Sequence, residues 1–518
     1  MHDEPCSPNA QTGDMPDSQT SSPLTNVRIR TFQLALFGLF LSTYAYFSSA
    51  AQWNENSRFD LTRSVVERGR LDIDPYHVNT QDKAYYRGHY YCDKAPGVSF
   101  LAVPAYAGLY ALRHAVGKEL PRQWVERTTG EPDPVTGRPL LHPIMRYNAA
   151  YKRGLYFSNL LANALPAALA VALLFGFIAR RRPHTIGAAF FAAIAYGLGS
   201  LAFPYATLFY GHQAAGSVLL ITFIWALHAP PDGPPKPWWH EAVMGFLLAL
   251  AVAIEYPAAL ASIVVGVVIL MRSSRRAATV AFLAAGALLP AVALALYHNA
   301  CFGGPFSLGY QHLANKQFAQ GMSKGLVGIT IPNPIVLLRI LAGPHRGLLY
   351  QSPVLVLVPM GIAVLWRRHQ MEAIAITAVI TAFLLLNASY YMWDGGAALG
   401  PRHMIPSLGL AAVALGYAYP SQPGRAASWT RGLVWTAAVI SMANMLAATA
   451  VGPEAPLGVF DPLTAYIWPH FLHGELALNI ASSNVGLNMH LPGLVSLVPL
   501  VVLWTGAAVA LAWVVKKD

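Results

Sequence analysis

Charged residues are scarce in this chain of 518 residues, because Asp, Glu, Lys and Arg together fill only 11% of its positions. Soluble domains carry about 25% charged residues, so the composition excludes an ordinary soluble protein. Hydrophobic residues make up 55%, and the 12 Trp and 24 Tyr are typical of membrane–water interfaces, where an aromatic ring keeps one end in water. The composition therefore predicts a membrane protein.

Cysteine is equally scarce. The three cysteines, Cys6, Cys92 and Cys301, show neither the spacing of metal ligands nor a paired disulfide framework. Cys92 and Cys301 could meet outside the membrane, but two unrelated free thiols are the favoured interpretation. The cysteines therefore predict no metal site.

Internal repeats are also missing, and no ionisable residue stands convincingly in the middle of an apolar run. Secondary transporters typically show repeated halves, interrupted helices or charges at mid-membrane depth, so a transporter is the least favoured function. The net charge of +11 raises nucleic acid as a partner. However, Lys and Arg stand in short clusters between apolar runs and form no stripe, so nucleic-acid binding is set aside.

What the sequence does contain is a series of apolar runs, and a helix that crosses a bilayer needs about 20 residues. Thirteen runs are candidates, of which two short ones are taken as separate helices broken at "EYP" (255–257). They cover residues 32–51, 97–116, 154–179, 185–203, 212–229, 239–254, 258–271, 277–297, 348–366, 371–388, 403–419, 431–451 and 493–515.

Basic clusters indicate which runs cross, because cytoplasmic loops carry an excess of Lys and Arg. The basic clusters occupy residues 26–30, 179–184, 272–276, 366–369 and 515–518. They all fall on one side of the membrane only if one of the apolar runs before residue 179 does not cross. The weakest run is 97–116, which contains Pro104 and continues into "GKEL". With this run lying in the outer leaflet, about 12 transmembrane helices remain and both termini are cytoplasmic.

The N-terminal region has two alternative readings. Residues 1–31 are rich in Ser, Pro, Asp and Gln, which predicts a disordered cytoplasmic tail. The run Phe32–Ala51 ends in small residues typical of a signal-peptide cleavage site. The tail before it is long and the run nearly spans a bilayer, so a retained helix is favoured.

This crossing pattern makes residues 52–153 one extracytoplasmic unit. Its densest polar stretch, residues 56–97, directly follows the first apolar run. Polar and aromatic residues concentrate on the same face of the membrane in the other outer segments, which are 203–213, 255–257, 298–347, 388–404 and 452–492.

Asp60 is the first candidate catalytic residue. Apolar neighbours recur around it at helical spacing, which predicts a short amphipathic helix on the membrane surface with Asp60 near its start. On spacing alone, a first-turn acid favoured by the helix dipole is the simpler interpretation. Asp72 and Asp74 resemble a metal-binding acid pair only weakly and are interpreted as turn residues.

Lys94 stands at the start of the run that is not expected to cross. A lysine at this depth usually extends toward water or lipid headgroups. Here it follows Tyr90, Tyr91 and Asp93, which would suit the wall of a pocket and are candidate substrate contacts.

Arg346 and Arg402 stand at the outer ends of membrane helices, against the positive-inside bias, and therefore call for a reason. Nearby glycines would let an extended ligand approach, and arginine suits bidentate contacts with phosphate. An ion pair of Arg402 with Asp394 is the equally weighted alternative. His212 and Glu255 also cap outward helix ends and are either site residues or satisfied interfacial groups.

Three motifs follow the first apolar run in order: an acid, then "ERG" and "DPY", then an aromatic stretch that ends in "DKAPG". This pattern resembles the lipid-carrier-dependent glycosyltransferases of the GT-C superfamily, and among them the bacterial aminoarabinose transferases and protein O-mannosyltransferases. The segment Lys94–Gly97 is a variant of the Lys-Pro-Pro-type motif that opens a juxtamembrane helix there. The resemblance is clearest over residues 50–260, although "GGAALGPRHMIP" looks like a pattern in uncharacterised bacterial relatives.

The resemblance implies an inverting glycosyltransferase that uses a polyprenyl-phosphate sugar on the extracytoplasmic face of the plasma (inner) membrane. Asp60 matches the family's first-loop acid, the implied general base, and Lys94 matches a contact of the lipid phosphate. Relatives often carry a second acid in the next outer loop, where this chain has His212, so a two-carboxylate mechanism is in doubt. Lys94, Arg346 and Arg402 would stabilise the leaving phosphate. No cofactor is expected, and a divalent metal is left open.

The implied architecture is an all-α polytopic membrane protein with a GT-C-like first loop. Its parts are a tail (1–31), a catalytic membrane module (32–297) and a variable C-terminal membrane region (298–518) with outer loops 298–347 and 452–492. The implied partners are the donor, membrane lipid and an acceptor that is a glycan, a lipid or a protein. The alternatives are a lipid-linked glycan ligase or other carrier-binding protein and, less favoured, a transporter.

Overall fold

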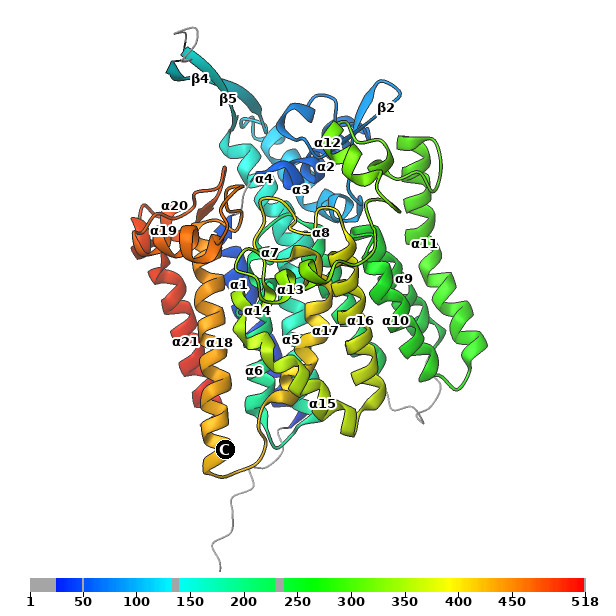
Figure 1. Cartoon of the computed structure of the whole chain (residues 1–518), viewed down its shortest axis with the longest axis vertical. Coiled ribbons are helices and arrows are strands. Elements are labelled where there is room, and N and C mark those ends of the chain that lie inside the picture. The colour runs from blue at the N-terminus through cyan, green and yellow to red at the C-terminus, as the bar shows by residue number, and fades with distance from the viewer. Residues whose placement is uncertain (1–24, 49–50, 133–138, 229–236, 517–518) are drawn as a thin grey trace, which may run out of the picture.

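The computed structural model describes residues 25–48, 51–132, 139–228 and 237–516. They form a bundle of helices that is capped at one end by loops, short helices and hairpins (Figure 1). The chain is therefore an all-α polytopic membrane protein, as the sequence predicts, whereas the number of crossings stays a prediction. Within the described ranges, five helices are long and apolar enough to cross a membrane, namely Ala149–Arg181, Arg276–Phe302, Gln370–Ser389, Arg425–Val451 and Gly493–Val515.

The helices of the N-terminal half follow the apolar runs closely. They are α1 (Asn26–Ala45), α4 (Ala149–Asn159), the π-turn η2 (Leu160–Ala164), α5 (Leu165–Arg181), α6 (Ile186–Gly197), α7 (Ala202–Ala206), α8 (Gly211–His228), α9 (Trp238–Ile254), α10 (Ala258–Met271) and α11 (Arg276–Phe302). The expected break at "EYP" is confirmed, because α9 ends at Ile254 and α10 begins at Ala258. Pro257 forms the N-cap of α10.

The helices of the C-terminal half are shorter and more often interrupted. They are α13 (Pro334–Ala342), α14 (Leu348–Gln351), η4 (Pro353–Leu357), α15 (Val358–Arg368), α16 (Gln370–Ser389), η5 (Arg402–Met404), α17 (Ile405–Ala418), α18 (Arg425–Val451), η6 (Leu463–Ile467), α19 (Trp468–Leu472), α20 (Val485–Asn488), η7 (Gly493–Leu497) and α21 (Val498–Lys516).

Helix α1 begins earlier than the sequence analysis expects. Asn26 is its first residue, and the Thr25 hydroxyl accepts a hydrogen bond from the backbone amide three residues on, which is the usual role of an N-cap threonine. Phe32 is buried against an aromatic ring of α5. The prediction of disorder is therefore wrong for residues 26–31, and residues 1–24 lie outside the described ranges.

The cap contains the first outer loop and part of the loop after α11. Its elements are α2 (Trp53–Arg68), η1 (His77–Asn79), β2 (Lys83–Tyr86), β3 (His89–Cys92), α3 (Gly97–Ala115), β4 (Gln123–Pro132), β5 (Pro139–Tyr147), η3 (Gly309–Gln311) and α12 (Lys316–Met322). The strands form antiparallel pairs, β2 with β3 and β4 with β5. A third pair joins β1 (Phe47–Ser48), just after α1, to β6 (Ser483–Asn484) in the last outer loop.

Helix α2 is buried on every side over most of its length. Residues 54–64 are all buried, so the expected amphipathic helix on the membrane surface is wrong. The ring of Phe59 lies edge-on to Tyr106 of α3 and Tyr151 of α4, with a centroid distance of 5.1 Å to each. The polar side chains of α2 can remain in this interior because many of them hydrogen-bond to one another and to neighbouring elements such as α3.

Gly97 brings the start of α3 against the end of α9. A Cβ at this position would lie 2.6 Å from backbone atoms of Ala253 and Ile254, closer than real side chains come. Only glycine permits this approach of the two backbones. The contact holds the "DKAPG" segment against the turn that carries Glu255.

Two of the three cysteines lie in one small apolar cluster of the cap. Cys92 and Cys301 are both free and both buried, together with Ile73 and Phe302. The interpretation as free thiols is confirmed for this pair, and Cys6 lies outside the described residues.

The position of α3 makes the predicted outer loop testable. In Figure 1, α3 lies in the cap beside α2 and α4. Val125 in β4 is 46% exposed, so Val125→Cys in an otherwise cysteine-free variant should react with a membrane-impermeant thiol reagent added outside intact cells. Ser428→Cys, at the expected cytoplasmic end of α18, should react only after permeabilisation. Labelling of position 125 only after permeabilisation would mean that α3 crosses.

Candidate functional site

A small polar cavity, called the polar chamber here, lies where the cap meets the bundle and has a volume of about 60 Å³. Its charged and ring-bearing lining residues are Arg58, Asp82, Asp93, Lys94, His212, Glu255, Tyr310, Phe318, Tyr390, Tyr391, Arg402 and His403. The fold thereby brings together five of the residues that the sequence singles out, namely Asp93, Lys94, His212, Glu255 and Arg402. They come from outer segments far apart in the chain.

Arg402 is a cation of the polar chamber that forms no ion pair with an acidic side chain in the described part of the chain. Its Nη1 donates a 3.3 Å hydrogen bond to the Tyr210 hydroxyl, and its buried Nε has no partner among the described residues. The alternative ion pair with Asp394 is not formed, and Asp394 Oδ1 instead accepts a hydrogen bond from the Gly396 amide. An arginine with free donors beside a cavity is well suited to bind an anion.

Lys94 is held between two carboxylates. Its Nζ lies 2.9 Å from Asp93 Oδ2 and 3.1 Å from Asp82 Oδ2. Burial alone would lower the pKa of Lys94, but these two carboxylates raise it above its usual value, so the side chain is charged at neutral pH. The lysine therefore brings a fixed and oriented positive charge to the chamber.

Arg58 joins three segments, and each of its three guanidinium nitrogens has a partner. Its Nη2 lies 3.0 Å from Glu255 Oε2, its Nε donates to Asn54 Oδ1 at 3.0 Å and its Nη1 donates to the Ala95 carbonyl at 3.1 Å. His212 Nδ1 lies 3.6 Å from the same Glu255 oxygen. Arg58 and Glu255 thus build the wall of the chamber, and His212 completes it.

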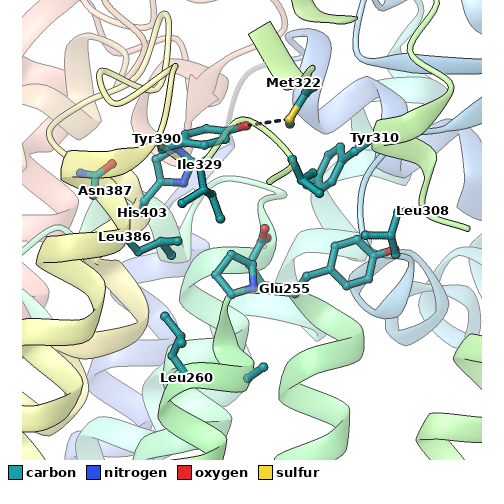
Figure 2. Close-up of a pocket in the computed structure, with 14 residues that line it drawn as sticks. Glu255, Leu260, Leu308, Tyr310, Met322, Ile329, Leu386, Asn387, Tyr390 and His403 are labelled. Atoms are coloured by element: carbon teal, nitrogen blue, oxygen red, sulfur yellow. Dashed lines mark hydrogen bonds between the residues drawn. The ribbon is translucent and has the colours of Figure 1, made fainter. Parts of the chain in front are cut away.

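A larger apolar cavity, called the apolar chamber here, adjoins the polar one and has a volume of about 320 Å³ (Figure 2). Figure 2 shows Leu260, Leu308, Ile329 and Leu386 around it, from α10, the segment before η3, the loop after α12 and α16. The residues that line both chambers are Glu255, Tyr310, Met322, Tyr390 and His403. The two chambers therefore form one amphipathic site with an apolar and a charged end.

Glu55 is fully buried on α2, next to the chamber residue Asn54, and it is within electrostatic range of the chamber residues Arg402 and Asp82. Neither of its carboxyl oxygens has a hydrogen-bond partner among the described residues. Burial raises the pKa of Glu55 well above its usual value, and the nearby Glu454 carboxylate raises it further. A buried carboxyl group without partners requires an explanation, and a group that meets substrate provides one.

Glu454 lies in the loop after α18 and faces the same region. Its Oε1 accepts a 2.7 Å hydrogen bond from the Tyr210 hydroxyl, which in turn accepts from Arg402, while its Oε2 has no partner among the described residues. Burial also raises the pKa of Glu454. Glu55 and Glu454 are thus two buried carboxyl groups near each other, each with an oxygen that has no partner among the described residues.

Asp60 lies outside the polar chamber, in a separate buried cluster. Its Oδ1 accepts a 3.2 Å hydrogen bond from Asn79 Nδ2 and lies 3.8 Å from Arg63 Nη1, while its Oδ2 has no partner among the described residues. Burial raises the pKa of Asp60 to about 8, more than Arg63 lowers it. The expectation of an ionised carboxylate beside the chamber cations is therefore wrong, because Asp60 lies in another cluster, next to Arg63, and burial keeps it mainly protonated at neutral pH.

Asp60→Asn should leave turnover near normal and change the pH dependence of stability. The folded-state pKa of about 8 lies above the ordinary aspartate value, so the stabilisation from the protonated carboxyl is complete below about pH 4 and is lost as the pH rises through 8. Asn keeps the neutral form at every pH. Between pH 6 and 9 the unfolding temperature of the variant should therefore decrease less steeply than that of the wild type. A turnover loss of about 10²-fold would return Asp60 to the role of base.

Tyr90 and Tyr91 also lie outside the polar chamber. The ring of Tyr90 stacks on His77 at a centroid distance of 4.1 Å, and Tyr91 lies edge-on to Phe302 at 5.6 Å. Both belong to strand β3, and they stabilise the β2–β3 hairpin against α11 and the loop around η1. The structure does not place them where a ligand of the chamber would meet them.

Arg346 is fully engaged with backbone carbonyls. It donates to the carbonyls of Asp394, His345 and Gly396, and only 3% of it is exposed. These bonds hold the glycine-rich loop before Arg402 in place. Arg346 and Asp394 thus support the loop and do not line the chamber.

The residues that the sequence analysis misses are Glu55, Arg58, Asp82 and Glu454. The first two lie beside Asp60 in the same helix, where a helical wheel shows Glu55 and Arg58 on one side. Asp82 is part of the same outer loop as Lys94. Glu454 has no local signal, since only the fold brings the last outer loop to α2.

No family model and no curated protein matches the chain. The similar solved structures include two of ArnT from Cupriavidus metallidurans, one bound to undecaprenyl phosphate and one in the apo state. The first is 12% identical over 93% of this chain and 74% of that chain, with a TM-score of 0.49. The second is 12% identical over 93% of this chain and 73% of that chain, with a TM-score of 0.45. ArnT is a GT-C aminoarabinose transferase, the branch that the first outer loop resembles. At this identity and these TM-scores, neither match decides what the chain binds or catalyses.

Proposed function

We propose that the chain is an inverting glycosyltransferase, which moves a sugar from a polyprenyl-phosphate donor to an acceptor on the extracytoplasmic face of the membrane. The joined pair of chambers carries the proposal. One end is apolar and suits a hydrocarbon chain, whereas the other holds Lys94 and the unneutralised Arg402. A ligand with a hydrocarbon chain at one end and an anionic group at the other matches both chambers. A soluble sugar nucleotide has no hydrocarbon chain and would leave the apolar chamber empty.

The two cations act on the leaving group. When the bond between the anomeric carbon and the phosphate oxygen breaks, the lipid phosphate gains about one negative charge. Donors that are already fixed in place stabilise such a charge without reorganisation. Arg402 offers free N–H groups, and Lys94 offers a charge that Asp82 and Asp93 orient.

Glu55 is the proposed general base in place of Asp60. The acceptor hydroxyl must lose its proton as its oxygen attacks the anomeric carbon, and a carboxylate with free oxygens can accept that proton. Glu55 has two such oxygens and lies one helical turn from Arg58 at the chamber wall. A single displacement of this kind inverts the configuration at the anomeric carbon.

The experiment is to incubate the purified protein with a panel of polyprenyl-phosphate sugars and a membrane extract as the source of acceptor. Release of free lipid phosphate that depends on the sugar and on the protein is expected, with inverted configuration in the isolated product. Tight binding of the carrier without release from any member of the panel would contradict the proposal. That outcome would favour a carrier-binding protein without sugar transfer of its own.

A further inference from the structure

A third cavity lies on the outer side of the bundle, away from the two chambers. It has a volume of about 640 Å³ and lies between the end of α1, the start of α4 and the loop around β6 and α20. In Figure 1, α20 and α4 lie to the left of α12 and α16, which border the chambers. This cavity, called the outer groove here, is lined by Tyr46, Lys152, Arg153, Tyr156, Ser483 and Asn488, among others.

The outer groove lies at the level of the lipid headgroups. Lys152 stands in the first turn of the continuous helix Ala149–Arg181, and Arg180 stands in its last turn. The two are about 28 residues apart, or about 42 Å at 1.5 Å per residue, which matches the thickness of a bilayer with both headgroup layers. Because the basic cluster at Arg180 marks the cytoplasmic headgroups, Lys152 marks the outer ones.

Two adjacent cations in the groove lack acidic partners. Lys152 and Arg153 are both exposed, and neither forms an ion pair with any residue that the structure describes. The neighbouring outer cation Arg146, in contrast, is paired with Glu126. Two unpaired cations on the outer face oppose the positive-inside bias and leave an anionic ligand as the natural counter-charge.

The remaining walls suit an amphiphile. Phe157 is 41% exposed beside the cations, and Tyr156 is fixed by a hydrogen bond from its hydroxyl to the Ala45 carbonyl at 2.8 Å. Aromatic side chains at this depth contact the boundary between headgroups and acyl chains. Ser483 and Asn488 line the other side, where the Ser483 hydroxyl donates to Asn488 Oδ1 at 2.9 Å and the amide nitrogen of Asn488 is the donor left to meet a polar head.

We propose that the outer groove binds the phosphate headgroup of an anionic lipid from the outer leaflet, with Lys152 and Arg153 as its counter-charges. The site is separate from the donor chambers and its occupancy does not depend on the proposed transfer reaction. Basic pockets between membrane helices are a recurrent way of binding acidic headgroups.

Occupancy of the groove should also order the last outer loop. β1 pairs with β6 through Ser48 and Ser483 at the groove, and the Ala51 amide donates to the Ile480 carbonyl at 2.9 Å. In the same loop Asn479 Nδ2 donates to the Glu454 carbonyl at 2.7 Å. A headgroup in the groove therefore contacts the segment that holds Glu454.

The test uses the full-length protein in nanodiscs of phosphatidylcholine with and without phosphatidylglycerol. Native mass spectrometry should show preferential retention of phosphatidylglycerol, and amide exchange of residues 478–488 should slow when it is present. In Lys152→Ala/Arg153→Ala the preference should fall about 30-fold, from the loss of two basic residues near the headgroups. Lys118→Ala/Arg122→Ala is the matched control, because it removes two exposed outer cations that do not line the groove.

Several results would overturn the proposal. They are an absence of preference in the wild type, an equal loss in both double variants, and equal protection of residues 478–488 by inorganic phosphate without anionic lipid. If the groove variant fails to fold, the wild-type protein is measured at high salt instead. A lipid preference that depends on two exposed cations must weaken there, because salt screens exposed charges. A preference that does not change with salt would exclude Lys152 and Arg153 as its source.

Discussion

Arg402→Ala should weaken donor binding at least about 30-fold, the largest loss expected for any cation of the polar chamber. The side chain has no acidic partner among the described residues and a buried Nε without an acceptor, so a phosphate in the chamber supplies what the free protein lacks. Losing one partner of a buried charge pair typically costs about 2 kcal/mol or more, which is a factor of about 30 in the dissociation constant. The measurement is direct binding of a polyprenyl phosphate to the purified variant.

Three variants separate this role from general damage. Arg402→Lys keeps the charge but loses the planar fork, so an intermediate loss is expected. Lys316→Ala removes an exposed cation from α12 and should bind the donor normally. Arg346→Ala should lower thermal stability, because it frees the loop carbonyls of Asp394 and Gly396. Unchanged lipid binding in a folded Arg402→Ala variant would remove the arginine from the site.

Glu55→Gln should lower kcat by about 10²-fold or more while donor binding is kept, because the amide has nearly the same shape but cannot accept the proton. Single-turnover measurements with saturating donor would report the chemical step. Asp60→Asn is the matched comparison, since it makes the same type of change in the same helix, but at a carboxyl that contacts Asn79 and Arg63. Loss in the Asp60 variant with normal turnover in the Glu55 variant would reverse the assignment.

The pH profile gives a second measure of Glu55. Burial and Glu454 raise its pKa, so the rate should fall on the acid side at a pH above the ordinary range of glutamate. Glu454→Gln removes the neighbouring negative charge and lowers that pKa. The acid limb should therefore move to lower pH in the Glu454 variant. A profile that does not move would mean that Glu454 has only a structural role beside Tyr210.

Arg402 was predictable because it stands at a predicted outer helix end, against the positive-inside bias, and Lys94 because it follows a cluster of tyrosines and Asp93 at the start of α3. Both line the polar chamber. The break between α9 and α10 was also predictable, since Pro257 cannot donate the hydrogen bond of a helix interior. Arg346 also stands against the positive-inside bias, but it binds the backbone carbonyls of a loop. No local sequence pattern distinguishes an arginine that binds a ligand from one that binds the backbone.

The acids were not predictable from pattern alone. Helix α2 is covered on every side, so its sequence shows no polar face that would separate Glu55 from Asp60. The polar content that suggested a wet surface is in fact held inside by mutual hydrogen bonds. Glu454 reaches the site through the pairing of β1 with β6 and the fold of the last outer loop. A contact of such long range leaves no trace in the local sequence.

The contact at Gly97 limits how the donor can enter. The polar chamber has about 60 Å³, whereas pockets for small molecules usually measure roughly 300 Å³ or more, so it must widen to hold a sugar phosphate. The side that carries Lys94 cannot retreat, because at Gly97 its backbone already abuts Ala253 and Ile254. This side of the chamber therefore stays fixed. The opposite wall, made by α12 and residues 390–392, has to move outward when the proposed donor binds. Mutations in that wall would slow donor binding even where they remove no charge.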